Sequence, residues 1–155
     1  MEIEKKYLVR RLPDHVEQYP HDEIEQAYLC QHPTLRIRRK GGKYFFTYKN
    51  RPKDTPTDTC VAEEVETAID FDTYMHLYEK ADGDPIHKTR YRIPYEGHTI
   101  ELDLFHGSRE GMMLAEVEFA SVEESKRFIP PDWFGENVSG DVRYSNAWMA
   151  LHSEN

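Results

Sequence analysis

Residues 2–6 read EIEKK, which spaces three charged side chains, Glu2, Glu4 and Lys6, two positions apart. Alternate side chains of a β-strand point to the same side, so these three charges share one face and the apolar Ile3 lies on the other. Two interpretations follow. The segment is an edge strand whose charged face meets water, or its charged face points into a site that needs charge. The other strands of the chain decide between them.

The same alternation of charged side chains recurs along the chain, and each row carries mainly one sign. The acidic rows contain Glu2, Glu4, Glu64, Glu66, Glu101, Asp103, Glu116 and Glu118, and the basic rows contain Arg36, Arg38, Lys49, Lys88, Arg90 and Arg92. An ordinary sandwich with its charged faces in water is compatible with this spacing. However, exposed ion pairs contribute only about 0–1 kcal/mol each, so a solvated surface gains little from sorting the charges. A barrel with a charged interior gains a binding site, and we favour that architecture.

Turn and helix signals between the charged rows indicate an α+β fold. Hairpin connections are predicted at 40–43, 95–98 and 106–111, and a longer loop at 50–59. Helices are predicted at 70–81 with Asp70 or Asp72 as N-cap, from Ser121 to the Pro130-Pro131 pair, and from Ser145 through Leu151. Seven or eight antiparallel strands with these helices predict one domain spanning 1–155, a closed barrel with a charged lumen and a few helices packed outside.

The composition is that of a soluble globular protein, with 155 residues, 38% of them hydrophobic and 32% charged. No apolar run approaches the roughly 20 residues that span a bilayer, and an apolar signal segment is lacking, so we expect a cytoplasmic protein without a membrane partner. A net charge of −9 argues against a nucleic-acid partner. The two cysteines, Cys30 and Cys60, each stand alone, which suggests neither a disulfide framework nor a zinc site.

The chemistry of such a lumen follows from its side chains. Arg and Lys rows neutralise a highly charged anion, and the Arg fork matches phosphate oxygens. Carboxylate clusters suit Mg²⁺ or Mn²⁺, with phosphate oxygens and water completing the coordination shell. A basic wall beside carboxylate-bound metal therefore predicts a site for a polyphosphate chain. The sequence has no GxxxxGK[ST] loop, so a P-loop enzyme is not indicated.

Eight segments, in order along nearly the whole chain, carry a family resemblance. They are EIEKK (2–6), LRIRR (35–39), TYK (47–49), EEVE (63–66), KTRYRIPYEG (88–97), IELDLFHG (100–107), GMMLAEVEF (111–119) and DVRYSN (141–146). The first matches ExExK, and the ordered set resembles the CYTH superfamily, also called triphosphate tunnel metalloenzymes. The resemblance implies an eight-stranded antiparallel β-barrel that forms a tunnel, a triphosphate-bearing small molecule as substrate, and dependence on a divalent metal.

The resemblance also implies roles for residues at matching positions. Glu2, Glu4, Glu116 and Glu118 would bind metal, and Lys6, Arg36, Arg38, Lys49, Lys88, Arg90 and Arg92 would bind the triphosphate, with Arg143 near one tunnel mouth. Glu64, Glu66, Glu101 and Asp103 would act in catalysis by holding a second metal or orienting water. For these four acids, ion pairing inside the barrel is an equal alternative. For Arg143 the alternative is capping or packing near Trp148.

The resulting hypothesis is metal-dependent hydrolysis of a triphosphate. The resemblance to small bacterial-type members favours inorganic tripolyphosphate, split to pyrophosphate and phosphate, with nucleoside triphosphates as further substrates. Three alternatives remain at this stage: an adenylyl cyclase, a thiamine triphosphatase with an aromatic platform such as Trp133 and Phe134, and a non-catalytic module that binds polyphosphate or nucleotide. A monomer and a homodimer are both compatible with the sequence.

Overall fold

The computed structural model describes residues 1–52 and 58–152. Its strands are β1 (Glu2–Val9), β2 (His21–Cys30), β3 (Thr34–Lys40), β4 (Lys43–Asn50), β5 (Cys60–Ile69), β6 (Asp82–Tyr95), β7 (His98–Phe105), β8 (Met113–Phe119) and β9 (Phe134–Asn137). Its α-helices are α1 (Phe71–Tyr78), α2 (Val122–Arg127) and α3 (Asn146–Leu151), and short 3₁₀ turns lie at Val16–Gln18, Gly107–Arg109 and Val142–Tyr144. Within the described ranges, no helix is long and apolar enough to cross a membrane.

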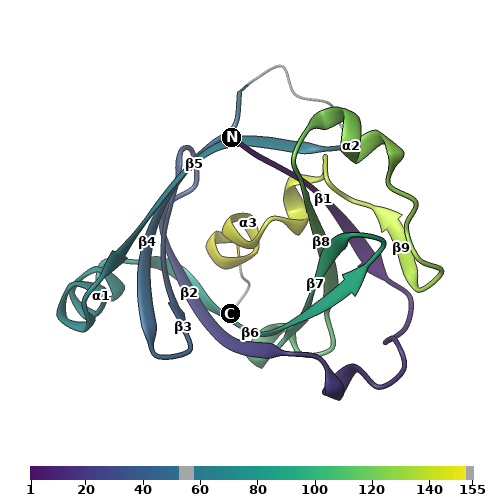
Figure 1. Cartoon of the computed structure of the whole chain (residues 1–155). Coiled ribbons are helices and arrows are strands. Elements are labelled where there is room, and N and C mark those ends of the chain that lie inside the picture. Colours follow the sequence, from purple (N-terminus) through teal and green to yellow (C-terminus); the bar gives the residue numbers. More distant parts are fainter. Residues whose placement is uncertain (53–57, 153–155) are drawn as a thin grey trace.

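The strands form one antiparallel sheet that closes into a barrel (Figure 1). Their order is β5-β4-β3-β2-β6-β7-β8-β1-β9, and β5 also pairs with β1. Eight strands therefore form a closed ring, and β9 adds to the outside of it beside β1. This confirms the predicted eight-stranded antiparallel barrel. The hairpins predicted at 40–43 and 95–98 join β3 to β4 and β6 to β7. The loop predicted at 50–59 falls partly on 53–57, outside the described residues.

Two strands have no counterpart in the predicted charge rows, β2 and β9. Gln26 of β2 lies directly opposite Arg38 of β3, so it points to the same side of the sheet as the basic row. Ile24 and Tyr28 share that side, which therefore mixes an aliphatic, an amide and an aromatic side chain. No charge alternation marks such a strand. β9 has four residues, too few to show any period.

Polar side chains cap all three helices at their N-termini, as the sequence signals indicate. Asp70 accepts a hydrogen bond from the Thr73 N–H (2.7 Å), Ser121 from the Glu124 N–H (3.1 Å), and Ser145 from the Trp148 N–H (3.1 Å). The first helix ends at Tyr78, three residues before the predicted 81.

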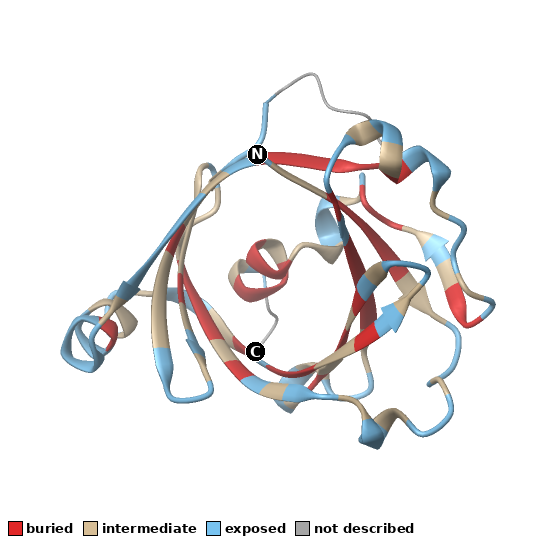
Figure 2. Cartoon of the chain, viewed as in Figure 1, coloured by how far each residue is buried: buried red, intermediate tan, exposed pale blue. Residues whose placement is uncertain are grey.

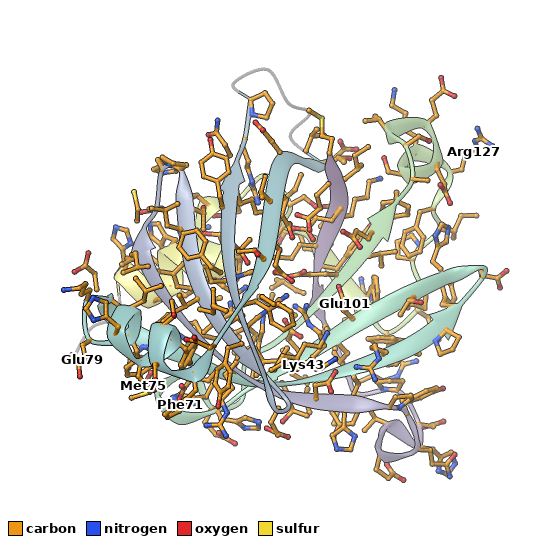
Figure 3. The ribbon with its side chains drawn as sticks, turned by 60° about the vertical axis from the view of Figure 1, so that its left-hand side comes forward. Lys43, Phe71, Met75, Glu79, Glu101 and Arg127 are labelled. Carbon is orange, nitrogen blue, oxygen red and sulfur yellow. The ribbon has the colours of Figure 1, made fainter. Side chains whose placement is uncertain are left out.

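Helices α1 and α2 lie outside the barrel, as predicted. Tyr74 of α1 packs with Ala27 and Ile37 on the outer face of the sheet. Phe71 and Met75 of the same helix are exposed (Figure 3). Helix α2 is fixed by the buried ammonium group of Lys5, which donates a hydrogen bond to the Ser125 carbonyl (2.8 Å).

Helix α3 departs from the predicted arrangement, because it lies inside the ring of strands (Figures 1 and 2). Its Ala147, Met149 and Ala150 pack in one cluster with the barrel side chains Tyr28, Ile86, Phe105 and Leu114. Leu114 lies opposite Asp103, and Phe105 opposite Lys88, so these apolar residues share the inner face with the charged rows. The lumen is thus charged in one part and apolar in the other, and the apolar part buries α3.

The start of β6 and the turn after β7 hold α3 in place. Gly83 has a φ of +71°, and a Cβ there would lie 2.1 Å from the Ala150 carbonyl oxygen. Only glycine allows this approach at that backbone conformation. Arg109 donates a hydrogen bond to the Met149 carbonyl (2.7 Å) and contacts Asp84 (3.3 Å). These contacts fix the last turn of α3 against the barrel wall.

We predict that Gly83→Ala loosens α3 and lowers the stability of the fold. The matched control is Gly97→Ala, because Gly97 has a φ of +76° but no described atom within 4 Å of its Cβ position. Backbone strain alone should cost about 1 kcal/mol in the control, whereas the collision with α3 should raise the loss in Gly83→Ala to at least about 3 kcal/mol. Thermal and urea unfolding measure both values. Equal losses in the two variants would contradict the close packing of α3 on β6.

Candidate active site

A cavity of about 430 Å³ occupies the charged part of the lumen, bounded by the N-terminal end of α3. Among the predicted site residues, it is lined by Glu2, Glu4, Lys6, Arg36, Arg38, Lys49, Glu64, Lys88, Arg90, Glu101, Glu116 and Glu118. These side chains come from β1 and from β3 to β8, as far as 116 residues apart in the chain. The barrel therefore gathers most of the predicted residues around one space.

The strand register explains why the charged rows meet. Residues directly opposite each other in paired strands point to the same side of the sheet. Glu4 lies opposite Glu118, and Lys6 opposite Glu116. Glu101 of β7 also lies opposite Glu116. Because the period of a strand is two, one such match aligns the whole row of each strand with the lumen.

Lys49 lies among the carboxylates of β1 and β5. Its ammonium group forms an ion pair with Glu2 and lies 3.6 Å from Glu4 and 3.7 Å from Glu64. Burial raises the pKa of Glu4 to about 7, because Lys49 and Lys6 do not offset the desolvation and the nearby Glu116 and Glu2. In this part of the cavity, the negative charge of the carboxylates therefore exceeds the positive charge of the cations beside them.

The negative charge of Glu116, in contrast to that of Glu4, is well compensated by nearby cations. Its carboxylate lies 3.4 Å from the Lys6 ammonium and 3.6 Å from the Arg90 guanidinium. Burial alone would raise its pKa, but Lys6 and Arg90, with further help from Lys88 and Lys49, hold the pKa well below its usual range. Glu116 stays ionised throughout the physiological pH range.

A fully buried cluster of Lys88, Arg90 and Asp103 closes the opposite wall. Arg90 donates two hydrogen bonds to the two carboxylate oxygens of Asp103 (2.7 and 2.9 Å), and the Lys88 ammonium lies 2.9 Å from the same carboxylate. Lys88 also donates a hydrogen bond to the Asn146 side chain at the start of α3 (3.1 Å). Burial lowers the pKa of Lys88 to about 8, although Asp103 opposes that shift. Asp103 thus fixes both bases in the wall.

Glu66 plays a similar part for the Arg row of β3. Its carboxylate accepts hydrogen bonds from Arg38 (3.1 Å), Arg36 (3.4 Å) and the Thr47 hydroxyl (2.8 Å). These partners lower the pKa of Glu66 against the effect of its burial. Glu66 and Asp103 therefore hold bases rather than lining the cavity, which matches the ion-pairing alternative for these two acids.

Two predicted substrate-binding residues lie away from the cavity. The Arg92 guanidinium forms an ion pair with Asp22, and its side chain is 39% exposed. Arg143 donates to Asp141 (2.6 Å) from a side chain that is 67% exposed. Both sit on the expected elements, but each is turned toward a nearby carboxylate.

Several cavity residues lack a counterpart in the sequence prediction. Gln26 and Tyr28 come from the unpredicted β2, and Asn146 comes from the helix that was expected outside. Lys40 continues the Arg36 and Arg38 row and could have been assigned from it. Asn146 ends the DVRYSN segment (141–146) of the resemblance, but only Arg143 of that segment was assigned to the site.

No family model matches the chain as a whole or in part. A curated inorganic triphosphatase of Nitrosomonas europaea is 39% identical to it over an alignment of 157 positions, which covers 97% of this chain and 97% of that protein. The chain belongs to the inorganic triphosphatase family. A second inorganic triphosphatase, from Acetivibrio thermocellus, is 34% identical over 116 positions, 74% of this chain and 69% of that protein.

Solved structures of this family and fold agree with the barrel. One match is the crystal structure of an inorganic triphosphatase whose sequence is 37% identical to this chain. The superposition covers 97% of this chain and 95% of that chain, with a TM-score of 0.70. A Hippeastrum protein, described as a putative adenylyl cyclase with a dominant triphosphatase activity, is 20% identical with a TM-score of 0.63. At that identity the second likeness concerns the fold alone.

The carboxylates of this triphosphatase-family chain suit a divalent cation in their chemistry. Burial raises the pKa of Glu2 and Glu118 as well as that of Glu4, and neighbouring carboxylates add to each shift. Carboxylate oxygens are ligands that hard cations such as Mg²⁺ prefer. In the described ranges, no group of three or more His, Cys, Asp or Glu side chains converges closely enough to hold an ion. The ammonium group of Lys49 lies between Glu2, Glu4 and Glu64 instead.

We predict that Glu4→Gln stabilises the metal-free protein above neutral pH. A carboxyl whose pKa rises from 4.5 to about 7 on folding binds its proton more tightly in the folded state. The stability that it contributes is therefore present below 4.5 and lost as the pH rises to 7. Removing the charge should raise the free energy of unfolding at about pH 8 by roughly 1–3 kcal/mol.

The measurement is thermal and urea unfolding in EDTA as a function of pH, with Glu63→Gln as the control, since Glu63 is exposed on the other face of its strand. Unfolding in Mg²⁺ completes the test: the wild type and Glu63→Gln should gain stability from the metal, and Glu4→Gln should gain little. A Glu4→Gln variant that is no more stable than wild type at high pH would contradict the buried charge.

Proposed function

We propose that this protein is a divalent-metal-dependent tripolyphosphatase, which hydrolyses inorganic tripolyphosphate to pyrophosphate and phosphate and accepts nucleoside triphosphates less well. The observation that carries the proposal is one cavity that combines an Arg and Lys wall with crowded carboxylates. It occurs in a chain that is 39% identical, over nearly all of its length, to a protein named inorganic triphosphatase. The eight ordered motifs support the finer assignment to the CYTH superfamily.

The basic residues of the cavity would bind the phosphoryl oxygens. Arg36 and Arg38 extend from β3, Lys49 from β4, and Lys88 and Arg90 from β6, so cations face the cavity from several directions. Guanidinium groups bind phosphate oxygens in pairs and stabilise the charge that spreads over the transferred group. Because the salt bridges with Glu66 and Asp103 fix four of these bases in advance, little reorganisation accompanies binding.

Glu2, Glu4, Glu116 and Glu118 would hold the metal, which we take to be Mg²⁺ or Mn²⁺. When bound, such an ion neutralises phosphoryl charge and polarises the phosphorus toward attack by water. Glu64 and Glu101 line the same cavity without the multiple hydrogen bonds that occupy Glu66 and Asp103. We assign Glu64 and Glu101 to positioning the attacking water and the other two to positioning the bases. Lys6 lies between Glu116 and the Tyr144 carbonyl, where it would hold Glu116 in place as well as bind a phosphoryl oxygen.

The aromatic side chains argue against a thiamine triphosphatase. Trp133 and Phe134, the candidates for an aromatic platform, pack with Tyr7 in the cluster on the outer face of the barrel. Among the described residues that line the cavity, Tyr28 is the one Phe, Tyr or Trp, and it is almost fully buried. The cavity therefore offers no aromatic platform for a thiamine or purine ring among the described residues. A bare phosphate chain needs no such platform.

The remaining expectations stay predictions. We place the protein in the cytoplasm, as one domain over 1–155, acting as a monomer or homodimer without nucleic-acid or membrane partners. The decisive experiment measures phosphate release from tripolyphosphate, ATP and thiamine triphosphate, each with Mg²⁺, Mn²⁺ or EDTA. Metal-dependent release that is fastest from tripolyphosphate is the expected result. Tight binding of tripolyphosphate without release from any compound would favour the binding module, and formation of cyclic AMP would favour the cyclase.

We further predict that Arg38→Ala lowers kcat/KM for tripolyphosphate by at least about tenfold, because a charge-assisted contact with a phosphoryl oxygen is lost. Arg39→Ala is the matched control. Arg39 is the next residue, exposed on the opposite face of β3, where its guanidinium lies over the Tyr44 ring. Steady-state kinetics of both variants at saturating Mg²⁺ test the assignment. An equal effect of the two substitutions would remove Arg38 from the substrate site.

A further inference from the structure

One wall of the cavity carries polar atoms that have no partner. Among the described residues, three buried side-chain atoms lack a hydrogen bond: Oε1 of Gln26, Nε of Arg36 and Nε of Arg38. All three residues line the cavity, on the neighbouring strands β2 and β3. A buried polar group without a partner costs about 1–3 kcal/mol, so each one in a native fold calls for an explanation. Their gathering on one wall points to a ligand that supplies the missing contacts.

Gln26 is the member of this wall whose presence the proposed function does not already explain. Its side chain is fully buried, and it lies opposite Arg38 on one side and Ile86 on the other. Its Nε2 donates a hydrogen bond to the Tyr28 hydroxyl oxygen (2.6 Å). An uncharged amide has no ion-pairing role in a charged wall. A leucine or methionine would fill the same space without leaving a polar atom unpaired.

The amide group can present either of its ends to the cavity. The terminal torsion of a glutamine is broad and two-fold, so exchanging Oε1 and Nε2 costs little. The Tyr28 hydroxyl both donates and accepts, so it can donate to Oε1 as readily as it accepts from Nε2. In the exchanged orientation, Oε1 is satisfied by Tyr28 and the NH₂ group faces the cavity as a hydrogen-bond donor.

We propose that Gln26 is a substrate-binding residue of the triphosphate site, whose NH₂ group donates to a phosphoryl oxygen while Tyr28 fixes the amide. The inference rests on the proposed function and deepens it. An anion among Arg36, Arg38 and Arg90 offers only acceptors, which selects the donor end of the amide. Gln26 is fully buried and lies opposite Ile86 of the apolar cluster around α3, so we expect it to contact the phosphoryl group nearest that cluster.

The test uses Gln26→Met and Gln26→Glu, which keep the length of the side chain. Loss of a hydrogen bond to a charged oxygen should weaken tripolyphosphate binding about tenfold in Gln26→Met. Gln26→Glu should weaken it further, because a carboxylate faces the anion. Gln31→Glu is the matched control: it makes the same change in charge at a partly exposed residue that lines the same cavity, and it should weaken binding much less.

Binding is measured by calorimetry with tripolyphosphate and protein in EDTA, and KM and kcat are measured separately in Mg²⁺. The binding measurement tests Gln26 even if the wild type proves not to hydrolyse tripolyphosphate, which keeps the two proposals distinguishable. A merely structural role would lower the melting temperature of Gln26→Met and leave the dissociation constant of the folded protein unchanged. Wild-type affinity in Gln26→Met, or equal losses in Gln26→Glu and Gln31→Glu, would overturn the inference.

Discussion

The structure depends on one constraint: charges taken out of water into the barrel must be neutralised there. Lys88, Arg90 and Asp103 show the requirement in full, since each is almost completely buried and each contacts an opposite charge within 3 Å. A carboxylate left alone in such a place would be strongly disfavoured. Rows of like charge on one strand are therefore possible only because the barrel brings rows of opposite charge onto neighbouring or facing strands.

The same constraint divides the lumen into two parts. The interior of an eight-stranded barrel is just wide enough for side chains to fill it or for one small ligand to fit. Here the charged part of the lumen keeps a cavity, and the apolar part is filled by side chains. Leu114 and Phe105 begin that apolar part on the same strands that carry Glu116 and Asp103. Helix α3 completes it from inside, and Asn146 at its start bonds to Lys88. The helix thus covers the apolar part of the lumen and also supplies a polar group to the charged part.

The sequence predicted the parts of the fold in which charge alternates. Strands with a row of one sign, such as β8 with Glu116 and Glu118, were identified together with their inner faces. The second strand was missed because Ile24, Gln26 and Tyr28 show no such row, although its inner face carries cavity residues. The position of α3 was missed because apolar strand residues that face the lumen have the same sequence pattern as apolar strand residues that face outward. The ion-pair partner of each Arg also could not be predicted. Arg92 of β6 pairs with Asp22 of β2, and the sequence of β6 does not indicate that partner.

The balance of charge in the cavity is uneven in a way that suits its proposed ligands better than it suits the isolated protein. Around Glu4 the carboxylates exceed the cations, and the pKa of that group rises to about 7. Across the cavity, Arg36 and Arg38 share the single carboxylate of Glu66 and keep unpaired Nε atoms. A cation at the first place and a polyanion at the second would relieve both imbalances at once. Selection for stability alone would remove such mismatches, for instance by replacing Glu4 with a neutral residue, so their presence argues that this wall and its opposite are shaped for binding.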